Sequence, residues 1–322
     1  MANTKIIKQK IKAITSIKKI TKTMEMVAVS KMKKSVGEAT QLSDYIKEIK
    51  FVINKIKSES QESHRFFSNE IKPHLTSPIN RGGTEQPELV IIFASNKGLC
   101  GSFNTNIYKK TKKLKDENPG LKYAICFGKF AEKTARKLGL EIKLSYLDIE
   151  KLLHPTQISK IESFAKKMYL SGEVNKVHAV YTNFIKMGAY EPRAVTLYPI
   201  NKNLNIYTDT FNTVNNVIDG DSLQGRDVVR STAERVSSQI YTFEPNINLL
   251  IEKTVPKIIK MILYSFVIES RASENSSRSF AMKRANESAG ELLGSLKILF
   301  NKIRQDGITQ EIAEISAGAN AG

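Results

Sequence analysis

The stretch IIKQKIKAITSIKKITKTMEMVAVS, Ile6 to Ser30, decides the fold of this chain. Its apolar residues recur in steps of three and four, at Ile7, Ile11, Ile14 and Ile17 and then at Met24 and Ala28, with Thr21 between them. This spacing leaves a narrow apolar stripe on a helix, which is typical of the seam of a coiled coil. Between Asn3 and Ser58 there is no proline and a single glycine, so we expect one uninterrupted helix over residues 1–58.

The far end of the chain carries a matching arm, residues 247–322, in which the only proline is Pro256. Apolar residues again recur in steps of three and four, at Leu292, Leu296, Leu299 and Ile303 and then at Ile308, Ile312 and Ile315. At 1.5 Å per residue, the two arms would be roughly 80 and 100 Å long, well beyond the size of a globular domain. A narrow stripe on so long a helix needs a cover, so we predict that the arms pair along their stripes.

Between the arms the periodicity changes. Residues 59–87 are polar, contain three prolines and a Gly-Gly pair, and are interpreted as a connector. Residues 88–200 alternate strand signals with helical stretches, which predicts an α/β domain whose mostly parallel sheet carries helices on both faces. Residues 201–246 are rich in Asn, Asp, Thr and Ser and are interpreted as a polar insertion with one short helix near 228–240. Strands are expected near 88–94, 121–127, 140–147, 176–184 and 193–200.

The charge of the chain is strongly positive and unevenly distributed. The net charge of the 322 residues is +18, and the first 34 residues hold ten lysines against the single acid Glu25. Such a block favours an acidic docking partner over a merely solvated helix face. Cys100 and Cys126 form no paired framework, and the four histidines are scattered, so neither a disulfide scaffold nor a metal centre is predicted. No stretch is long and apolar enough for a signal peptide or a membrane span, which predicts a soluble or peripheral protein without a targeting sequence.

The loop after the first predicted strand, Ser95 to Ser102, lies where α/β folds often bind phosphate. It lacks both the G-x-G-x-x-G spacing and a Gly-Lys-Ser/Thr ending, so Gly98, Cys100 and Gly101 are interpreted as a tight structural turn. Cys100 has no histidine near it in sequence that would activate it as a nucleophile. No catalytic group, cofactor site or metal site is predicted.

Three stretches then resemble one known family in the order in which that family carries them. KITKTMEMVAVSKMKKS, Lys19 to Ser35, is similar to the N-terminal signature of the γ subunit of F-type rotary ATPases. SNKGLCGSFN, Ser95 to Asn104, resembles the central turn of that family, and AMKRANESAGELLGSLKILFNKIRQDGITQEIAEI, Ala281 to Ile315, resembles its closing signature. The resemblance implies an antiparallel coiled coil of the N- and C-terminal helices with an inserted Rossmann-like α/β domain.

The resemblance also implies a function without an active site on this chain. The γ subunit is the central shaft in a ring of three α and three β subunits, and couples ATP hydrolysis or synthesis on β to rotation, linked to transmembrane proton transport. Mg-ATP or Mg-ADP would be bound by β and no cofactor by this chain. An ε subunit and a membrane rotor ring are the further partners implied, with the protein peripheral at the cytoplasmic face of a bacterial-type cell membrane.

The expected contacts with β lie at both ends of the chain. The resemblance assigns Arg304, Gln305 and Thr309 to hydrogen bonds with a β loop, and places Met24 near the contact between shaft and β. The basic side chains expected to face acidic loops of β are Lys18, Lys19, Lys22, Lys31, Lys33 and Lys34.

Two alternatives stay open from the sequence. The chain would also fit the shaft of a specialised F-type-like ATPase that passes torque to a machine other than a synthase, and segment 201–246 appears longer than usual for the family. From another class, a basic coiled coil that binds nucleic acid fits the net charge. However, the first arm has no aromatic residue before Tyr45, and charge alone explains none of the three signatures.

Overall fold

The computed structural model describes residues 2–59, 66, 86–147, 155–200 and 247–320. They belong to two compact units, each described here by itself. The coil unit comprises Met1–Lys31, Leu99–Gly101 and Asn275–Gly322, and the sheet unit comprises Met32–Gly98 and Ser102–Glu274. Helices α1 (Ala2–Glu59) and α8 (Ile247–Asn320) each run through both units. Most of the predicted connector, the whole of segment 201–246 and its short helix lie outside the described residues.

The sheet unit is built on one five-stranded sheet in the order β3-β2-β1-β4-β5. The first four strands in this order are parallel, and β5 forms an antiparallel hairpin with β4, which confirms the prediction of a mostly parallel sheet. β1 is buried along its whole length because it lies at the centre of the sheet. The strands are β1 (Glu88–Phe93), β2 (Leu121–Phe127), β3 (Glu141–Tyr146), β4 (Lys176–Lys186) and β5 (Ala189–Tyr198).

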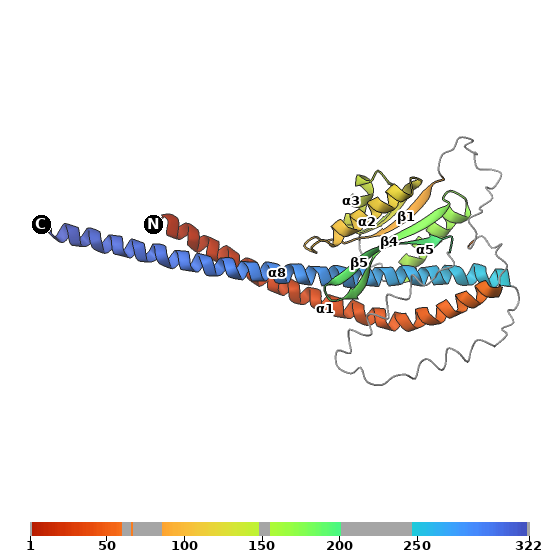
Figure 1. The fold of residues 1–322 in the computed structure, drawn as a ribbon, viewed down its shortest axis with the longest axis horizontal. Helices are drawn as coiled ribbons and strands as arrows, with labels where there is room; N and C mark the ends of the chain where they lie inside the picture. Colours follow the sequence, from red (N-terminus) through yellow and green to blue (C-terminus); the bar gives the residue numbers. More distant parts are fainter. Residues whose placement is uncertain (1, 60–65, 67–85, 148–154, 201–246, 321–322) are drawn as a thin grey trace, which may run out of the picture. The chain divides into compact units, whose positions relative to one another are not determined.

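Helices cover both faces of this sheet, as predicted (Figure 1). On one face, α2 (Phe103–Glu117) and α3 (Lys129–Lys137) bury small and aliphatic side chains against alternate residues of β1 and β2. On the other face, α5 (Pro155–Leu170) and the first part of α8 pack on the intervening residues. Because both faces of the sheet are covered, residues 89–93 of β1 and 124–127 of β2 are uninterrupted apolar runs.

Serines of α8 satisfy an open stretch of strand β4. β4 runs past the last residue that it pairs with on β1, and its Thr182 lies opposite Pro192, which has no N–H to donate. The Thr182 N–H donates to Ser270 Oγ at 3.3 Å, and Ser273 Oγ donates to the Thr182 carbonyl at 3.3 Å. These side chains therefore supply the hydrogen bonds that a neighbouring strand would otherwise provide.

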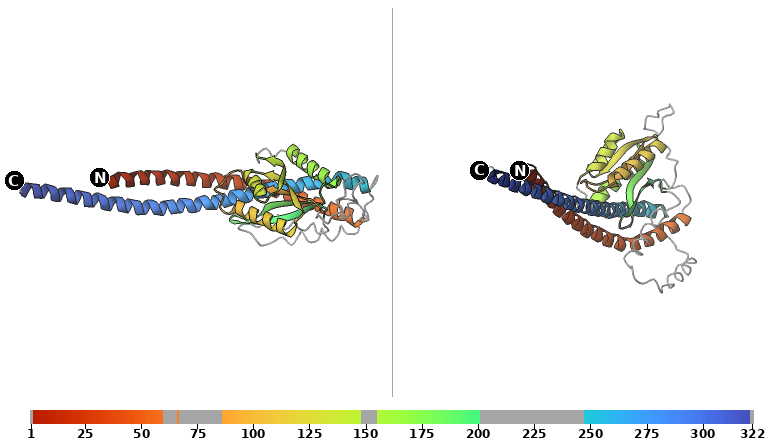
Figure 2. Two further views of the ribbon diagram at one scale, coloured as in Figure 1. Left: turned by 90° about the horizontal axis from the view of Figure 1, so that it is seen from above. Right: turned by 60° about the vertical axis from the view of Figure 1, so that its left-hand side comes forward.

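In the coil unit, α1 and α8 run antiparallel and side by side (Figures 1 and 2). A Cβ added at Gly290 would lie 3.3 Å from Lys18 Nζ, so the side chain of Lys18 reaches across to α8 at this level. The seam follows strict steps of four and three on each helix. On α1 the buried or half-buried positions of the seam are Ile7, Ile11, Ile14, Thr21, Glu25 and Ala28, and on α8 they are Asn275, Ser279, Met282, Asn286, Ala289, Leu293, Leu296, Phe300 and Ile303.

The seam corrects part of the predicted stripe. Ile17 is 50% exposed, Leu292 is 51% exposed and Leu299 is 44% exposed, so these three residues are not in the seam. Their places in the repeat are taken by Lys18, Leu293 and Phe300. An α-helix turns by about 100° per residue, so a stripe shifted by one position lies on a clearly different face.

No residue that the structure describes covers the end of α8, which corrects the expectation that the arms pair along the whole of their stripes. Figure 1 shows α8 running on past the start of α1, and residues 304–317 are all exposed. Ile308, Ile312 and Ile315 form an apolar stripe along this segment. Apolar side chains repeated at helical spacing without an internal partner indicate a surface that another protein covers.

Candidate functional site: the exposed faces of the coil unit

The lysines predicted to bind an acidic partner are solvent-exposed but do not lie on one face. Lys19 and Lys22 are three residues apart, on the flank of the seam beyond Lys18. Lys22 forms an ion pair at 3.2 Å with Glu25, the single acidic residue among the first 34 residues. Lys18 lies against Gly290 of α8 and bridges the two helices at the edge of the seam.

Met24 belongs to a second apolar stripe on α1, which we call the outer stripe. It consists of Ile17, Ile20, Met24 and Val27, spaced by three and four residues and set beside the seam. Met24 is half-buried, whereas the other three residues are each at least half exposed. Lys31 follows Val27 by four residues and so lies at the end of the same stripe. Met24 was predicted to lie in the seam itself. The sequence does not separate the two stripes, because both have a spacing of three and four.

Lys33 and Lys34 lie on the part of α1 that belongs to the sheet unit, where both are exposed. Their neighbours Met32, Ser35 and Ala39 are buried in that unit, Met32 against Ala272 and Ala39 against Ile268. The predicted basic run is therefore divided between the two units and between different faces of α1.

The three predicted residues of α8 all lie in the uncovered segment 304–317. Arg304, Gln305 and Thr309 are exposed, and Thr309 Oγ1 donates to the Gln305 carbonyl at 3.0 Å, one turn back along the helix. Charge differs sharply between the two helices of the coil unit. Residues 1–31 hold eight lysines and one glutamate, whereas residues 275–320 hold six cations and five anions. The basic character of this unit therefore belongs to α1.

The turn after β1 is anchored on α8. Cys100 is buried, and its carbonyl accepts a hydrogen bond of 2.6 Å from Ser277 Oγ. Gly101 has a positive φ of 55°, which favours glycine, and a Cβ there would lie 3.1 Å from the same hydroxyl, a tight contact. Gly98 lies in the bend after β1 but has neither a positive φ nor a close neighbour at its Cβ position. Leu99 instead has the positive φ, 61°, and its side chain is 63% exposed.

The polar groups of the preceding loop are occupied by bonds within the sheet unit. Asn104 Nδ2 donates to Ser95 Oγ at 2.7 Å, the Ser95 hydroxyl reaches the Lys97 carbonyl, and the Lys129 N–H donates to Asn96 Oδ1. Sequence reasoning missed Gly128, where β2 ends. Its φ is 92°, and a Cβ there would lie 2.3 Å from the Ala94 carbonyl oxygen. The sequence feature that could have indicated this role is the position of Gly128 between a predicted strand and a predicted helix.

Comparison with known proteins agrees with this geometry over the full length of the chain. Residues 3–321 match the family described as ATP synthase. The chain is 32% identical to the ATP synthase gamma chain of Chloroherpeton thalassium over 327 residues, which cover 100% of this chain and 98% of the relative. The gamma chain of Amoebophilus asiaticus is also 32% identical, with 100% and 99% covered. The chain belongs to the ATP synthase gamma-chain family.

Solved structures show the same fold. A chain of the Euglena gracilis mitochondrial ATP synthase (OSCP/F1/c-ring, rotational state 3) matches with a TM-score of 0.62 at 17% identity, covering 99% of this chain and 94% of that one. A chain of the Tetrahymena thermophila mitochondrial ATP synthase central stalk and c-ring matches with a TM-score of 0.51 at 20% identity, covering 83% and 99%. The fold of the gamma-chain family is therefore present here: a coiled coil of the terminal helices with an inserted Rossmann-like domain.

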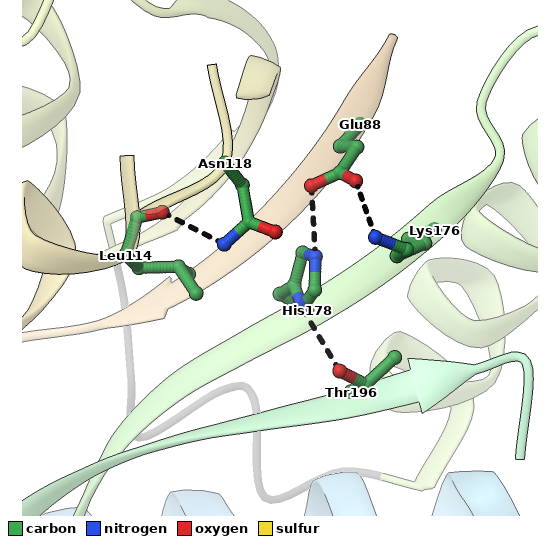
Figure 3. A network of polar contacts seen from close by, with 6 residues as sticks. All are labelled: Glu88, Leu114, Asn118, Lys176, His178 and Thr196. Atoms are coloured by element: carbon green, nitrogen blue, oxygen red, sulfur yellow. Dashed lines mark hydrogen bonds and ion pairs between the residues drawn. The ribbon is translucent and has the colours of Figure 1, made fainter. Parts of the chain in front are cut away.

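Figure 3 shows a buried polar network in the sheet unit. Glu88 of β1 contacts His178 Nε2 and Lys176 Nζ of β4, each at 3.0 Å, and His178 Nδ1 lies 3.1 Å from Thr196 Oγ1 of β5. Burial raises the pKa of Glu88, but hydrogen bonds from His178 and Lys176 more than offset this and leave the pKa below its usual value. The network ties three adjacent strands together, and Glu88 and His178 are almost completely buried.

Within the part of the chain that the structure describes, little supports a reactive thiol, a metal site or a membrane span. The thiol of Cys126 is buried, and desolvation raises its pKa to about 12, so it stays protonated. No group of three or more His, Cys, Asp or Glu residues within the described ranges is placed to hold a metal ion. None of the helices searched there is long and apolar enough to cross a membrane.

Proposed function

We propose that this chain is the central shaft of an F-type ATP synthase and couples rotation to ATP hydrolysis or synthesis on partner β subunits. The observation that carries the proposal is the coil unit, an antiparallel helix pair whose far end, residues 304–317, presents an apolar stripe that the described residues leave uncovered. The full-length family membership supports it, as do the central-stalk and rotor assemblies named among the matching structures.

The partners follow from this role. Three α and three β subunits would surround the coil unit, Mg-ATP or Mg-ADP would be bound by β, and no catalysis would occur on this chain. An ε subunit and a membrane rotor ring would complete the rotor, driven by or driving proton transport. The chain would then be peripheral at the cytoplasmic face of the cell membrane.

Contacts with β are proposed for two exposed surfaces. The first comprises the outer stripe and the lysines beside it, Lys18, Lys19, Lys22 and Lys31, with Lys33 and Lys34 further along α1. The second comprises Arg304, Gln305 and Thr309 on the uncovered end of α8. Because exposed ion pairs each contribute only about 0–1 kcal/mol, the lysines would guide the shaft over acidic loops without locking it at one angle. One asymmetric shaft would favour a different conformation in each of the three β subunits, which is how rotation and catalysis become linked.

Single-molecule rotation tests the proposal. The chain is assembled with its cognate α and β subunits, the complex is fixed through β, and a bead is attached to a cysteine introduced in place of the exposed Glu117 of α2. Both native cysteines are buried, so labelling is selective. We expect unidirectional rotation on addition of Mg-ATP, and no ATP hydrolysis by the chain alone. Hydrolysis by the assembled complex without bead rotation would refute the shaft function.

The alternative of a specialised ATPase that passes torque elsewhere is separated by a different measurement. The native complex is purified and its subunits are identified by mass spectrometry. A membrane rotor ring in the complex supports the synthase, whereas another assembly in its place supports the alternative.

A further inference from the structure

Helices α2 and α3 of the sheet unit lie side by side on one face of the sheet and point their remaining surface to solvent (Figure 1). Two contacts join them. Lys137 Nζ of α3 lies 5.8 Å from the centre of the Tyr108 ring of α2, and Lys115 Nζ of α2 donates to the Leu138 carbonyl at the end of α3. Their outer surfaces therefore form one continuous face, which we call the α2–α3 face.

Both helices carry the same pattern of cations on this face. Each has a basic residue followed by two more at the third and fourth positions after it, and all six side chains are exposed. Residues three and four apart on a helix have Cβ atoms about 5–6 Å from each other, and packed helices lie about 8–10 Å apart. The cations are Lys109, Lys112 and Lys113 on α2 and Lys133, Arg136 and Lys137 on α3.

The acids of these helices, Asp116, Glu117 and Glu132, neutralise little of this charge, and Asp116 is exposed and forms no ion pair within the described residues. Glu117 pairs with Lys113 at 3.7 Å, and the Glu132 carboxylate accepts a hydrogen bond from Ser145. Within the residues that the structure describes, Lys109, Lys112 and Arg136 take part in no ion pair. Cations held close together without counter-charges repel each other, and an anionic partner relieves that repulsion.

The chemistry of the face favours an acidic protein segment over a membrane or a nucleic acid. No large apolar side chain between residues 103 and 137 is exposed, so the face has no group to insert into the acyl boundary of a bilayer. Tyr108 is half-buried beneath Lys137 and so is not free to stack on a base. Two parallel rows of cations at helical spacing instead match the spacing of carboxylates along one face of an acidic helix.

We propose that the α2–α3 face is a docking surface for an acidic helix of a protein partner. Glutamates spaced by three and four residues along such a helix would meet cations from both α2 and α3. Binding would be electrostatic, fast to form and weakened by salt. The α2–α3 face belongs to the sheet unit and includes none of the residues proposed to contact β. The docking proposal therefore does not depend on the proposed function.

The probe is a synthetic 20-residue helical peptide of glutamate and alanine with glutamates at this spacing, compared with the same peptide carrying glutamine. Binding to the full chain is measured by fluorescence anisotropy at low and high salt. Because a chain of net charge +18 attracts any anion, the test depends on matched variants. The face variant is Lys109→Glu, Lys112→Glu, Arg136→Glu and Lys137→Glu. The control variant reverses four exposed lysines of α1 instead, Lys5, Lys8, Lys10 and Lys12.

We expect the face variant to bind the glutamate peptide about tenfold or more weakly, and the control variant to change the affinity about twofold or less. Circular dichroism melts check that both variants are folded, and a variant with glutamine at the four face positions should show an intermediate loss. Equal losses in the face and control variants would overturn the proposal in favour of non-specific charge attraction. Tighter binding of phosphatidylglycerol vesicles than of the peptide, lost in the face variant, would overturn it in favour of a membrane surface.

Discussion

Glu269 of α8 is the most completely buried carboxyl group with a raised pKa in the sheet unit. Burial raises its pKa well above the usual value, and the charge of Arg193 opposes this only in part. Its Oε2 is buried and accepts no hydrogen bond from a described residue. Its environment in the folded chain therefore favours the neutral acid over the carboxylate. Its stabilising contribution is complete below the usual carboxyl pKa and is lost as the pH rises through the raised, folded-state pKa.

We predict that Glu269→Gln stabilises the sheet unit at neutral and higher pH, by roughly 1–3 kcal/mol in the free energy of unfolding, because the amide has no proton to lose. Near pH 4 the variant and the native chain should be equally stable. Urea unfolding at pH 4, 7 and 8 measures this. Tyrosine fluorescence is a suitable signal because the tyrosines that the structure describes all lie in the sheet unit.

The exposed pair partner Glu117 provides the control, since Glu117→Gln removes a carboxylate without changing a buried group. It should shift stability by less than about 0.5 kcal/mol at every pH. If Glu269→Gln were instead destabilising at pH 7, then Glu269 would be charged in the fold and paired with Arg193.

At the scale of single elements, the two ends of α8 should differ in what their removal costs. Residues 304–322 follow the last seam residue, Ile303, and those described up to 317 are exposed. Residues 281–303 contain most of the α8 seam. A helix without a packed partner is marginal in water, so α1 depends on this segment for its own helicity.

We therefore predict that deleting 304–322 lowers the helical signal at 222 nm only in proportion to the residues removed, without changing the melting temperature. Deleting 281–322 should lower the signal by more than that proportion, because the first turns of α1 lose their cover and unfold. Circular dichroism of the two truncated chains measures both effects. A strictly proportional loss in the longer deletion would show that α1 is helical without α8.

Helices, strands and the sheet class were predictable from the sequence because each depends on local periodicity. The exact face of each long helix was not. α1 carries two apolar stripes at the same spacing, and the true seam passes through Lys18 and Glu25, whose long side chains lie along it and keep their charged ends near water. Choosing between the stripes requires knowing which side chains α8 presents to α1. Those side chains are about 270 residues away in the sequence.

The turn after β1 shows a second limit. Glycine at position 101 was expected from its type, but the positive φ of Leu99 was not, because a leucine rarely adopts that conformation. The turn is fixed by Ser277 through the Cys100 carbonyl, a partner that no local pattern connects with it. In the same way, the role of Ser270 and Ser273 in completing the edge of β4 depends on packing, and a serine-rich stretch of helix gave no indication of it.

At the scale of the whole molecule, the proposed function requires the coil unit to transmit torque without catalytic groups of its own, and Met24 tests this directly. Met24 is half-buried in the outer stripe, beside the seam residues Thr21 and Ala28. Met24→Lys would add a cation to the basic helix and place it next to apolar neighbours, at a cost on the order of 1 kcal/mol unless an acidic group of β pairs with it. Met26 is the matched control. It is 57% exposed and lies about 200° around the helix from Met24, so that Met26→Lys adds the same charge on the opposite face.

In the assembled complex, we predict that Met24→Lys leaves ATP hydrolysis within about a factor of two of the native rate, because the catalytic groups are proposed to lie on β. Torque per ATP should fall. An attraction that forms only at some shaft angles stabilises those angles over the others, so that part of the free energy of hydrolysis no longer drives rotation. Raised salt should restore torque in part, since it screens the new ion pair. Met26→Lys should change neither quantity. Measuring hydrolysis and torque on the same complexes separates the possibilities: parallel loss of both would indicate misassembly, and equal effects of the two variants would mean that the outer stripe has no special part in coupling.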